Sequence, residues 1–342
     1  MSDVQGDVRV GVLGCGRIGK MHAELLARQV PGAAVTMLFD VFAESATAVG
    51  AELGVPVAAT AKELIESADV DAVAICTSTD THVELMVAAA RAGKAIFCEK
   101  PISLDLAAVD AALAVVHSAG VPIQIGFNRR WDPSHASVRQ AVLDGSVGDL
   151  HLVRITSRDP APPPISYVKV SGGIFLDMTI HDFDMARFVT GSEVTEVYAT
   201  GAVRVDPAIG EAGDLDTVVI VLTHENGCIT TIDNSRQAVY GYDQRVEAFG
   251  SKGMAQSDNP RGDTGTLSTS SGTRAATIPY FFLDRYIPSY VNEWEAFVAM
   301  VRDRTPSPVP AEAGRAPLII GLAALKSVRD GRPVRTAEIT GA

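Results

Sequence analysis

A glycine-rich turn between a strand-like run and a helix-like run constrains the fold of this chain more than any other feature. Val8–Leu13 is apolar, Gly14-Cys15-Gly16-Arg17-Ile18-Gly19 follows it, and the residues after the turn have the apolar periodicity of a helix. Gly14 allows a tight turn, Gly16 has no Cβ to block a phosphate, and Gly19 lets the helix close on the strand. The pattern G-x-G-x-x-G in this context predicts a dinucleotide-binding unit.

An acidic residue at the end of the second predicted strand indicates which dinucleotide binds. Asp40 follows the apolar run 34–39 and lies about 20 residues after Gly19, as the fingerprint requires. Its carboxylate can accept hydrogen bonds from both hydroxyls of an adenosine ribose and would repel a 2′-phosphate. The helix start offers unpaired N–H groups to the phosphates. We therefore expect NAD in preference to NADP, held by Gly14, Gly16, Arg17, Ile18, Gly19 and Asp40.

Short apolar runs alternate with longer helical patterns through the first third of the chain. The predicted strands are 9–13, 34–39, 72–76, 95–98 and 122–126, and the predicted helices are 18–28, 45–53, 61–67, 82–92 and 106–118. Strict alternation implies right-handed crossovers and a parallel sheet. Nearly continuous apolar strands indicate that helices cover both of its faces. Residues 1–125 are thus predicted to form an α/β, doubly wound Rossmann domain that binds NAD.

The pattern changes after Gly126, where strand-like runs with short polar turns dominate. The predicted strands are 150–157, 193–205, 216–223, 228–235 and 244–250, and the predicted helices are 138–143, 175–189, 290–302 and 313–329. Such turns favour antiparallel pairing. The Gly/Ser/Thr-rich residues 262–271 indicate an exposed loop or a ragged hairpin. We predict that residues 126–342 form an α+β domain with a large, mainly antiparallel open sheet, which would bind substrate and mediate oligomerisation.

Composition excludes several classes of function. The 342 residues include 29 Lys plus Arg against 41 Asp plus Glu, a formal charge of −12. This acidic balance argues against a nucleic-acid partner and against a basic membrane-surface helix. No apolar run reaches the length of a membrane span, and no signal peptide is apparent. The four cysteines lack metal-ligand or disulfide spacing. We expect a cytoplasmic protein without nucleic-acid, membrane or metal partners.

Two predicted strands of the first domain end in polar residues. Thr77-Ser78-Thr79-Asp80-Thr81 follows one, and Glu99-Lys100-Pro101 follows the next. Ligands of such sheets bind beyond the carboxyl ends of the strands, so both segments should face the nicotinamide. The further cofactor-binding candidates are Thr77, Ser78, Thr81, His82, Glu99 and Lys100. A helix-start role also explains His82, and for that residue we favour it. The Lys100–Pro101 bond is a candidate for the cis form.

A carboxylate and an imidazole recur at helical spacing in the second domain. If residues 172–184 are helical, Asp177 and His181 lie on one face. A carboxylate beside an imidazole fixes its tautomer and raises its basicity, as a proton acceptor needs. A helix-surface pair or a satisfied core histidine explains the same spacing. Metal binding by Asp177, His181 and Asp184 lacks a further ligand, so no metal is predicted.

Together these motifs resemble the glucose–fructose oxidoreductase, inositol dehydrogenase and rhizopine-catabolism (Gfo/Idh/MocA) family. The fingerprint, Glu99-Lys100-Pro101 and the segment Gly172-Gly173 with Asp177 and His181 occur in the family's order, and the resemblance covers nearly the whole chain. It is greatest to the bacterial inositol 2-dehydrogenase branch, through residues 126–133, 156–160 and 240–244. Trp131 stands where phenylalanine is commoner.

The resemblance implies a catalytic group of Lys100, Asp177 and His181. His181 would accept the hydroxyl proton as hydride leaves for nicotinamide, Asp177 would orient His181, and Lys100 would bind the reacting oxygen. The implied reaction is oxidation of myo-inositol to a 2-ketone with NAD. Scyllo-inositol, a pyranose sugar or an amino-cyclitol are alternative substrates. A non-catalytic NAD-binding sensor is the alternative from another class, although it would not need all three residues.

A cyclitol exposes many hydroxyls, so its site should be rich in hydrogen-bonding side chains. The substrate-binding candidates are Lys100, Asn128, Arg129, Arg158, Asp159, Asp177, His181, Tyr240, Tyr242 and Tyr280. Arg158 and Asp159 could instead pair with each other at a surface. The family resemblance also implies a homotetramer formed through the open sheet face. Residues 218–222 are apolar on both faces, which fits that assembly and fits a helix-covered sheet equally.

Overall fold

The computed structural model describes residues 6–340 and divides the chain into two compact units. The first unit joins the chain up to Asn128 with Ser289–Ala316, and the second joins Arg129–Pro288 with the chain from Pro317 onward. The predicted division after residue 125 lies close to the first of these boundaries, but it leaves out the return of Ser289–Ala316 to the first unit. Helical periodicity shows that a segment has an apolar face, not which core that face joins.

The first unit contains a parallel sheet of five strands in the order β2-β1-β3-β4-β5. Its strands are β1 (Val8–Leu13), β2 (Ala33–Phe39), β3 (Ala72–Ile75), β4 (Ala95–Glu99) and β5 (Ile123–Gly126). The strand order reverses beside β1, since β2 and β3 flank it on opposite sides. Ligands of doubly wound sheets bind at such a switch point, outside the carboxyl ends of the strands. The predicted Rossmann arrangement is confirmed.

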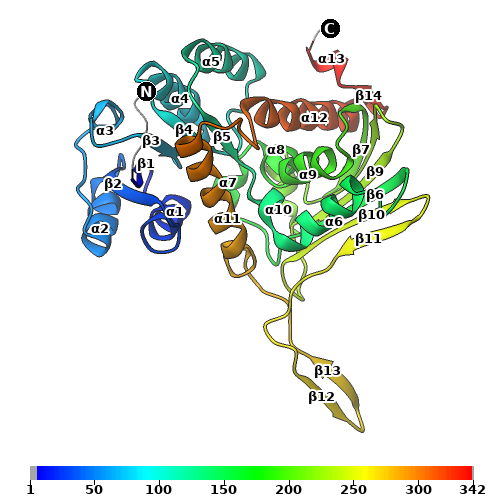
Figure 1. The fold of residues 1–342 in the computed structure, drawn as a ribbon. Helices are drawn as coiled ribbons and strands as arrows, with labels where there is room; N and C mark the ends of the chain where they lie inside the picture. Colours follow the sequence, from blue (N-terminus) through cyan, green and yellow to red (C-terminus); the bar gives the residue numbers. More distant parts are fainter. Residues whose placement is uncertain (1–5, 341–342) are drawn as a thin grey trace. The chain divides into compact units, whose positions relative to one another are not determined.

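Helices connect the strands of this unit and bury its core. They are α1 (Arg17–Arg28), α2 (Ala43–Leu53), α3 (Ala61–Glu66), α4 (Thr79–Arg91) and α5 (Leu106–Ala119). Figure 1 shows α2 and α3 beside the β2 edge. Helix α11 (Phe282–Asp303) adds Trp294 and Phe297 to the core, and the Trp294 ring stacks on Phe97 at 4.1 Å. The returning segment therefore completes the hydrophobic core of this unit.

The second unit contains a sheet of seven strands in the order β11-β10-β6-β9-β8-β7-β14. Its strands are β6 (Leu150–Arg158), β7 (Val194–Ala202), β8 (Thr217–His224), β9 (Ile229–Ser235), β10 (Asp243–Gly250), β11 (Gly253–Ser257) and β14 (Val334–Arg335). Only β6 and β9 pair in parallel; the other neighbouring pairs are antiparallel. The predicted, mainly antiparallel sheet is confirmed.

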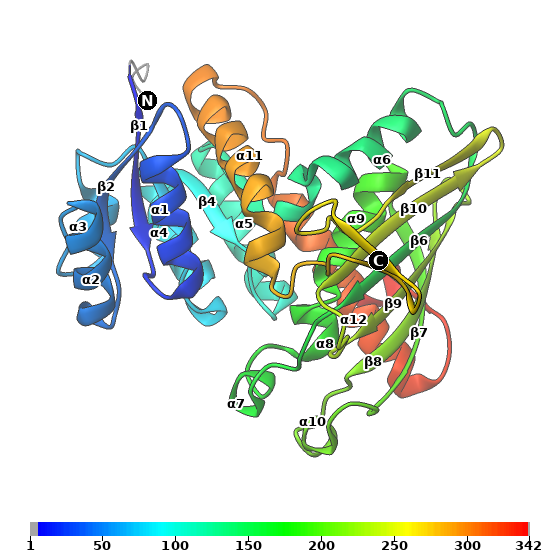
Figure 2. The same ribbon diagram turned by 90° about the horizontal axis from the view of Figure 1, so that it is seen from below.

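The second unit also contains several helices. They are α6 (Pro133–Leu143), α7 (Ile165–Val168), α8 (Gly173–Asp177), α9 (Ile180–Thr190), α10 (Pro207–Glu211), α12 (Ala311–Asp330), of which residues from 317 belong here, and α13 (Ala337–Thr340); a 3-10 turn covers Asn128–Trp131. Figure 2 shows α6 and α9 along the sheet. Val153, Ile155 and Ile220 point into the core beneath them. No helix within residues 6–340 is long and apolar enough to cross a membrane.

The other face of the sheet carries exposed apolar side chains. Alternate residues of β8 separate cleanly: Val218, Ile220 and Leu222 are buried, whereas Val219 is 47% exposed. The same face carries further exposed apolar side chains, from Leu152, Tyr198, Ile229, Phe249 and Met254. The run 218–222 thus has one face in the core and one open face.

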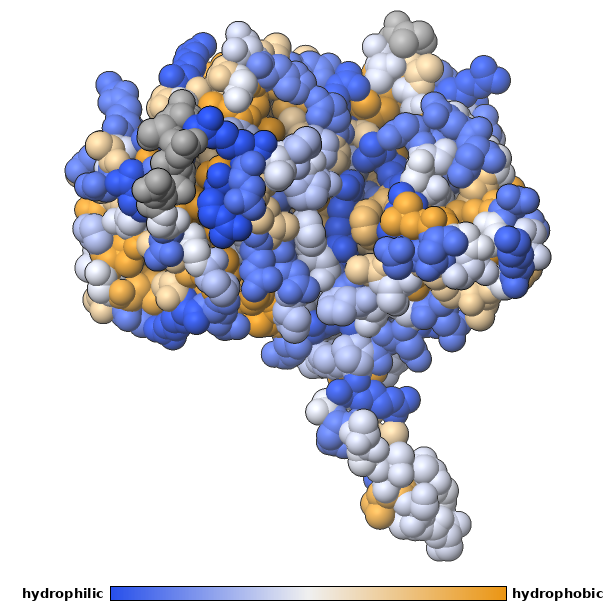
Figure 3. All heavy atoms as spheres, viewed as in Figure 1, coloured by the Kyte–Doolittle hydropathy of each residue, from blue (hydrophilic) through white to orange (hydrophobic). Residues whose placement is uncertain are grey.

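Two sequence expectations need correction in this unit. Residues 175–189 are not one helix, because α8 ends at Asp177 and α9 begins at Ile180. Residues 193–205 are not one strand, because β7 ends at Ala202 and α10 follows. The Gly/Ser/Thr-rich segment does form a hairpin, with β12 (Thr266–Thr269) and β13 (Gly272–Ala275) paired antiparallel and wholly exposed. Figure 3 shows it as a projecting arm of mostly intermediate hydropathy.

Candidate active site

The three glycines of the fingerprint have the geometry that a bound dinucleotide requires. Gly14 has φ of +92°, and a Cβ there would lie 2.6 Å from the backbone oxygen of Cys76. A Cβ on Gly19 would lie 1.8 Å from the Gly14 oxygen, so α1 closes on β1 only with glycine. A Cβ on Gly16 would meet nothing within 4 Å, and Gly16 and Arg17 are exposed. Open space therefore adjoins the N–H groups at the start of α1, as phosphates need.

Asp40 lies directly after β2 and is anchored by the glycine-rich loop. Its Oδ2 accepts a hydrogen bond from the Cys15 N–H at 2.6 Å, and its Oδ1 accepts one from the Phe42 N–H at 2.8 Å. Both donors are uncharged backbone groups, and each carboxylate oxygen retains a further acceptor site. The chain thus places a fixed carboxylate beside the glycine-rich turn.

The segments after β3 and β4 are tied together by His82. Its Nδ1 lies 2.9 Å from the Pro101 oxygen and its Nε2 lies 3.1 Å from the Thr77 oxygen. Burial lowers the pKa of His82, outweighing the two carbonyls, so the neutral ring donates to one of them. The Thr81 hydroxyl oxygen lies 2.7 Å from the Thr77 hydroxyl oxygen and 2.8 Å from the Ser78 carbonyl oxygen. These contacts agree with the structural explanation of His82, and Thr79–Thr81 forms the first turn of α4 rather than a loop.

Lys100 follows β4, and a buried network holds the residue before it. The Lys100–Pro101 bond is cis, as expected. The Glu99 carboxylate accepts hydrogen bonds from His22 Nε2 at 2.9 Å and from the Lys100 N–H at 3.1 Å. The Trp294 indole donates to His22 Nδ1 at 2.8 Å, so the imidazole proton lies on Nε2. Burial alone would raise the pKa of Glu99. The hydrogen bond from His22 and the charge of Lys100 outweigh burial, so the pKa is lowered.

Asp177 and His181 lie on successive helices rather than on one. The Ile174 carbonyl accepts the N–H groups of both Met178 and Thr179, which interrupts the helical ladder after Asp177. The Thr179 hydroxyl donates to Asn234 Oδ1 of β9 at 2.6 Å, anchoring the break to the sheet. Asp177 therefore ends α8 and His181 lies in the first turn of α9, each half-buried.

Asp177 is held from two directions by residues that the sequence patterns did not single out. The Tyr167 hydroxyl donates to Asp177 Oδ1 at 2.8 Å, and Arg236 Nη1 donates to Asp177 Oδ2 at 2.9 Å. Arg236 follows β9 and is 2% exposed. It also lies 3.8 Å from Asp159 Oδ2. A lone arginine after a strand carries no spacing signal, so only the fold reveals this role.

A second buried group lies beside α9. Arg129 pairs with Asp182 at 2.6 Å, and its Nη2 lies 3.3 Å from the Tyr242 hydroxyl. Asn234 Nδ2 donates to the other Asp182 oxygen. Burial raises the pKa of Asp182 to about 6, although the nearby Arg129 and its hydrogen bonds oppose that change. Burial likewise raises the pKa of Asp159 to about 6, against the nearby Arg236.

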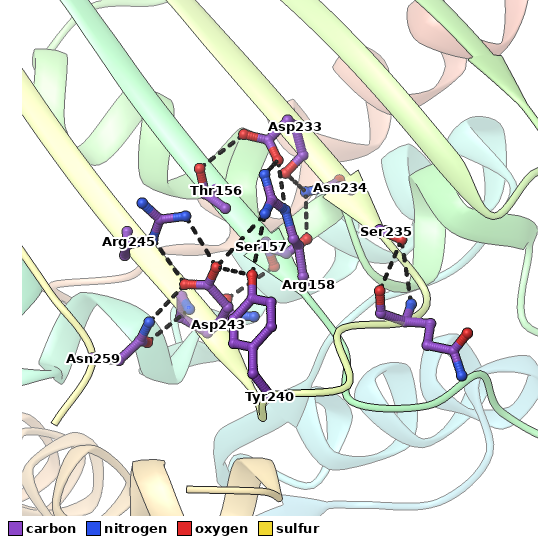
Figure 4. A network of polar contacts seen from close by, with 12 residues as sticks. Thr156, Ser157, Arg158, Asp233, Asn234, Ser235, Tyr240, Asp243, Arg245 and Asn259 are labelled. Atoms are coloured by element: carbon purple, nitrogen blue, oxygen red, sulfur yellow. Dashed lines mark hydrogen bonds and ion pairs between the residues drawn. The ribbon is translucent and has the colours of Figure 1, made fainter. Parts of the chain in front are cut away.

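The other second-unit candidates are not gathered with Asp177. Arg158 does not pair with Asp159: it donates to Asp233 and to the Tyr240 hydroxyl, which in turn donates to Asp243 (Figure 4). The alternation of β6 and β9 places Arg158 and Asp233 on the open face, away from the helices. Tyr280 is 60% exposed. Asn128, of the first unit, is buried.

Comparisons with known proteins agree with the fold and with these motifs. Residues 8–127 match the model of an oxidoreductase family with an NAD-binding Rossmann fold, and residues 135–256 match the GFO/IDH/MocA C-terminal domain. Myo-inositol 2-dehydrogenase of Thermotoga maritima is 49% identical over 98% of this chain and 100% of its own length. Inositol 2-dehydrogenase of Rhizobium meliloti is 46% identical over 96% and 99%.

A solved structure adds the ligands of one relative. The crystal structure of scyllo-inositol dehydrogenase from Lactobacillus casei with bound NAD(H) and scyllo-inositol is 31% identical, covers 97% of this chain and 99% of its own, and has a TM-score of 0.91. A Rossmann unit with an intact dinucleotide fingerprint joined to a second α+β unit defines an NAD-dependent oxidoreductase. The chain belongs to the Gfo/Idh/MocA family, which confirms the resemblance seen in its sequence.

Proposed function

We propose that this chain oxidises a secondary alcohol of a cyclitol, myo-inositol above all, to the ketone with NAD. The observation that carries the proposal is the gathering of buried hydrogen-bonding groups around Asp177 and α9. Arg129 contacts Asp182 of α9 and the Tyr242 hydroxyl, and all three residues belong to the same unit as Asp177. Asp177 and Asp182 each pair with a guanidinium, so part of their charge is compensated, which suits an uncharged ring of hydroxyls.

In the proposed reaction, Lys100, Asp177 and His181 act on the same substrate molecule. His181 accepts the proton of the reacting hydroxyl, and Asp177 orients the imidazole and stabilises its charged form. Lys100 donates to the reacting oxygen as its negative charge develops. When bound, NAD supplies the hydride acceptor. Gly14, Gly16, Arg17, Ile18, Gly19 and Asp40 hold its adenosine and phosphates, while Thr77, Ser78, Thr81, His82 and Glu99 form or support the edge nearer the reacting end.

The substrate is tested with a panel of polyols. Purified protein with NAD is assayed for NADH formation with myo-inositol, scyllo-inositol, glucose, L-glucose and an amino-cyclitol, each scored as kcat/KM. We expect myo-inositol to exceed the others, because a wrong epimer leaves buried polar groups unpaired. Scyllo-inositol is the second candidate, since a relative was crystallised with it. Turnover of another polyol alone would replace the substrate, and NAD binding without any turnover would indicate a sensor.

We further propose that the chain is a cytoplasmic homotetramer serving polyol catabolism. The exposed apolar side chains of the open sheet face support the oligomer, because a monomer rarely leaves such a contiguous patch in water. Light scattering after gel filtration should give four times the chain mass of 36.0 kDa. Val219→Asp should lower that mass, since it places a charge on this face. A monomeric wild-type protein would contradict the proposal.

A further inference from the structure

Arg236 carries a buried guanidinium group at the end of β9. It follows β9, its N–H donates to the Asp216 oxygen at 2.8 Å, and its side chain is 2% exposed. Removing a guanidinium from water costs free energy unless opposite charge and hydrogen bonds compensate it. Its Nε and Nη2 find no hydrogen-bond acceptor within residues 6–340. The side chain is therefore held mainly by its neighbouring carboxylates, and its closest partner is Asp177.

Three carboxylates surround this one guanidinium. Asp177 lies at 2.9 Å, Asp159 at 3.8 Å and Asp214 at 3.9 Å. They come from α8, from the residue after β6 and from the loop before β8. Asp159 also lies in the field of Arg129 and Asp182. Arg236 thus joins three separate segments, and its charge offsets acids that would otherwise repel one another.

The remaining oxygen of Asp177 is fixed by an uncharged donor. The Tyr167 hydroxyl of α7 donates to Oδ1, and burial with the nearby Asp177 raises the pKa of Tyr167 well above its usual value. The phenol therefore stays protonated and keeps donating. With Arg236 on Oδ2, the carboxylate has both oxygens oriented by side chains from outside α8. Its direction relative to α9 is thereby determined by Tyr167 and Arg236 together.

We propose that Arg236 is a positioning residue that orients Asp177 and partly compensates its charge, and thereby determines the pH at which His181, the proposed partner of Asp177, can accept a proton. This inference rests on the proposed function. An unbalanced Asp177 would bind the imidazolium strongly and keep His181 protonated at higher pH. The guanidinium weakens that attraction without removing the carboxylate that orients the ring. His181 is then neutral, and able to act as a base, at a lower pH than it would be beside Asp177 without Arg236.

The test compares the pH dependence of kcat/KM for myo-inositol and NAD in Arg236→Gln, Arg236→Lys and the wild type. Arg236→Gln should lower kcat/KM at neutral pH by about 10²-fold. It should also move the acid limb of the pH profile, where kcat/KM falls with decreasing pH, up by about one pH unit. Arg236→Lys retains the charge and should restore the acid limb, with kcat lowered by about 10-fold because the planar fork is lost. Affinity for NAD, measured by fluorescence quenching, should stay within about threefold, since the fingerprint is untouched.

Arg187→Gln is the matched control. Arg187 is also largely buried, in the same unit, and pairs bidentately with Glu193. It should lose stability with an unchanged acid limb. If Arg236→Gln does not fold, Tyr167→Phe tests the same geometry: kcat should fall by about threefold to tenfold with KM for NAD unchanged.

The possible failures are distinguishable. A wild-type protein with no polyol turnover overturns the proposed function. A wild-type protein that turns over, beside a folded Arg236→Gln with the wild-type acid limb, overturns only the role of Arg236. So does an Arg236→Lys protein whose limb moves as far as that of Arg236→Gln, because charge would then not be the cause.

Discussion

The carboxylates at the ligand edge of the first unit are held by uncharged donors, whereas those around α9 in the second unit are paired with arginines. Asp40 and Glu99 accept hydrogen bonds from backbone N–H groups and from His22. Asp177 and Asp182 face Arg236 and Arg129. An uncharged donor fixes a carboxylate and leaves its negative charge available, while a guanidinium fixes it and cancels the charge.

The difference matches the chemistry proposed for each unit. A ribose diol offers two hydroxyl donors, so the charge of Asp40 would strengthen the hydrogen bonds proposed between them. Glu99 is next to Lys100 in the chain, and the charge of Lys100 helps to lower the pKa of Glu99. A neutral polyol, by contrast, would gain little from net charge and would suffer from an uncompensated one. The second unit pairs Asp177 and Asp182 with guanidinium groups and adds the uncharged donors Tyr167 and Asn234.

Lys100→Met should have the largest effect, because it removes the ammonium group proposed to bind the reacting oxygen. We expect turnover to fall by at least about 10³-fold, since no donor would meet the developing oxyanion. Affinity for NAD should remain within about threefold, because the fingerprint and Asp40 are unchanged. Single-turnover kinetics and NAD titration measure the two quantities. Retained turnover would remove Lys100 from the reacting group.

Asp182→Asn tests the paired carboxylates through pH-dependent stability. Because burial raises the pKa of Asp182 to about 6, the stability it contributes is full below about pH 4 and is lost as pH rises through about 6. The wild-type free energy of unfolding should therefore include a fall of about 2 kcal/mol over this window, and the variant should lack it. Urea titrations at several pH values would measure this difference.

Asp216→Asn is the control for this pH dependence of the free energy of unfolding, with an expected effect of opposite sign. Asp216 is also buried, but burial is outweighed by the N–H groups of Arg204, Val205 and Asp206, and its pKa is lowered. Its stabilisation is present above about pH 4 and is lost as pH falls, so removing it should change the slope with the opposite sign. Equal slopes in both variants would show that the mode of pairing does not control the pH response.

Local sequence patterns predicted the parts of the site that depend on neighbouring residues. The turn Gly14–Gly19, the acid after β2 and the alternation of strands and helices all follow from steric and periodic rules. The side chains that hold those parts could not be predicted in the same way. Trp294 donates to His22 across 272 positions, and Arg236 reaches Asp177 across 59. Such pairs have no period and no motif, because only the folded topology brings them together.

The break between α8 and α9 was missed for a related reason. The apolar pattern of 175–189 is compatible with one helix, and the amide side chain that anchors the break at Thr179 belongs to Asn234 of β9. A tertiary hydrogen bond thus overrides the local preference. The same limit applies to Arg158. Arg158 and Asp159 are neighbours in sequence, so alternation along the strand directs their side chains to opposite faces of the sheet.

Asp40→Ser measures how much the uncancelled charge contributes to cofactor choice. NAD should bind about 10-fold more weakly, because two charge-assisted hydrogen bonds to the ribose become neutral or are lost. NADP should improve by about 10-fold, because a 2′-phosphate no longer meets a carboxylate. Initial rates at varied NAD and NADP give both values. Unchanged preference would exclude Asp40 from contact with the ribose.

Trp294→Phe should have the smallest effect and separates uncharged support from charged support most directly. The phenyl ring can keep the stack on Phe97, but the donor to His22 Nδ1 is lost and a buried acceptor is left unpaired. The free energy of unfolding should fall by about 1–3 kcal/mol. Turnover should fall by less than about 10-fold, and the acid limb should stay in place, because no charge changes near the reacting groups.

Phe297→Leu is the matched control, since Phe297 packs against the same Trp294 ring at 5.3 Å and makes no polar contact through its side chain. It should lose comparable stability with unchanged turnover, because the His22–Glu99 hydrogen bond remains. An acid limb that moves in Trp294→Phe would mean that the imidazole of His22 takes up a second proton once its indole donor is gone. Glu99 would then face a cation like Asp177, and the two units would no longer differ in how they hold their carboxylates.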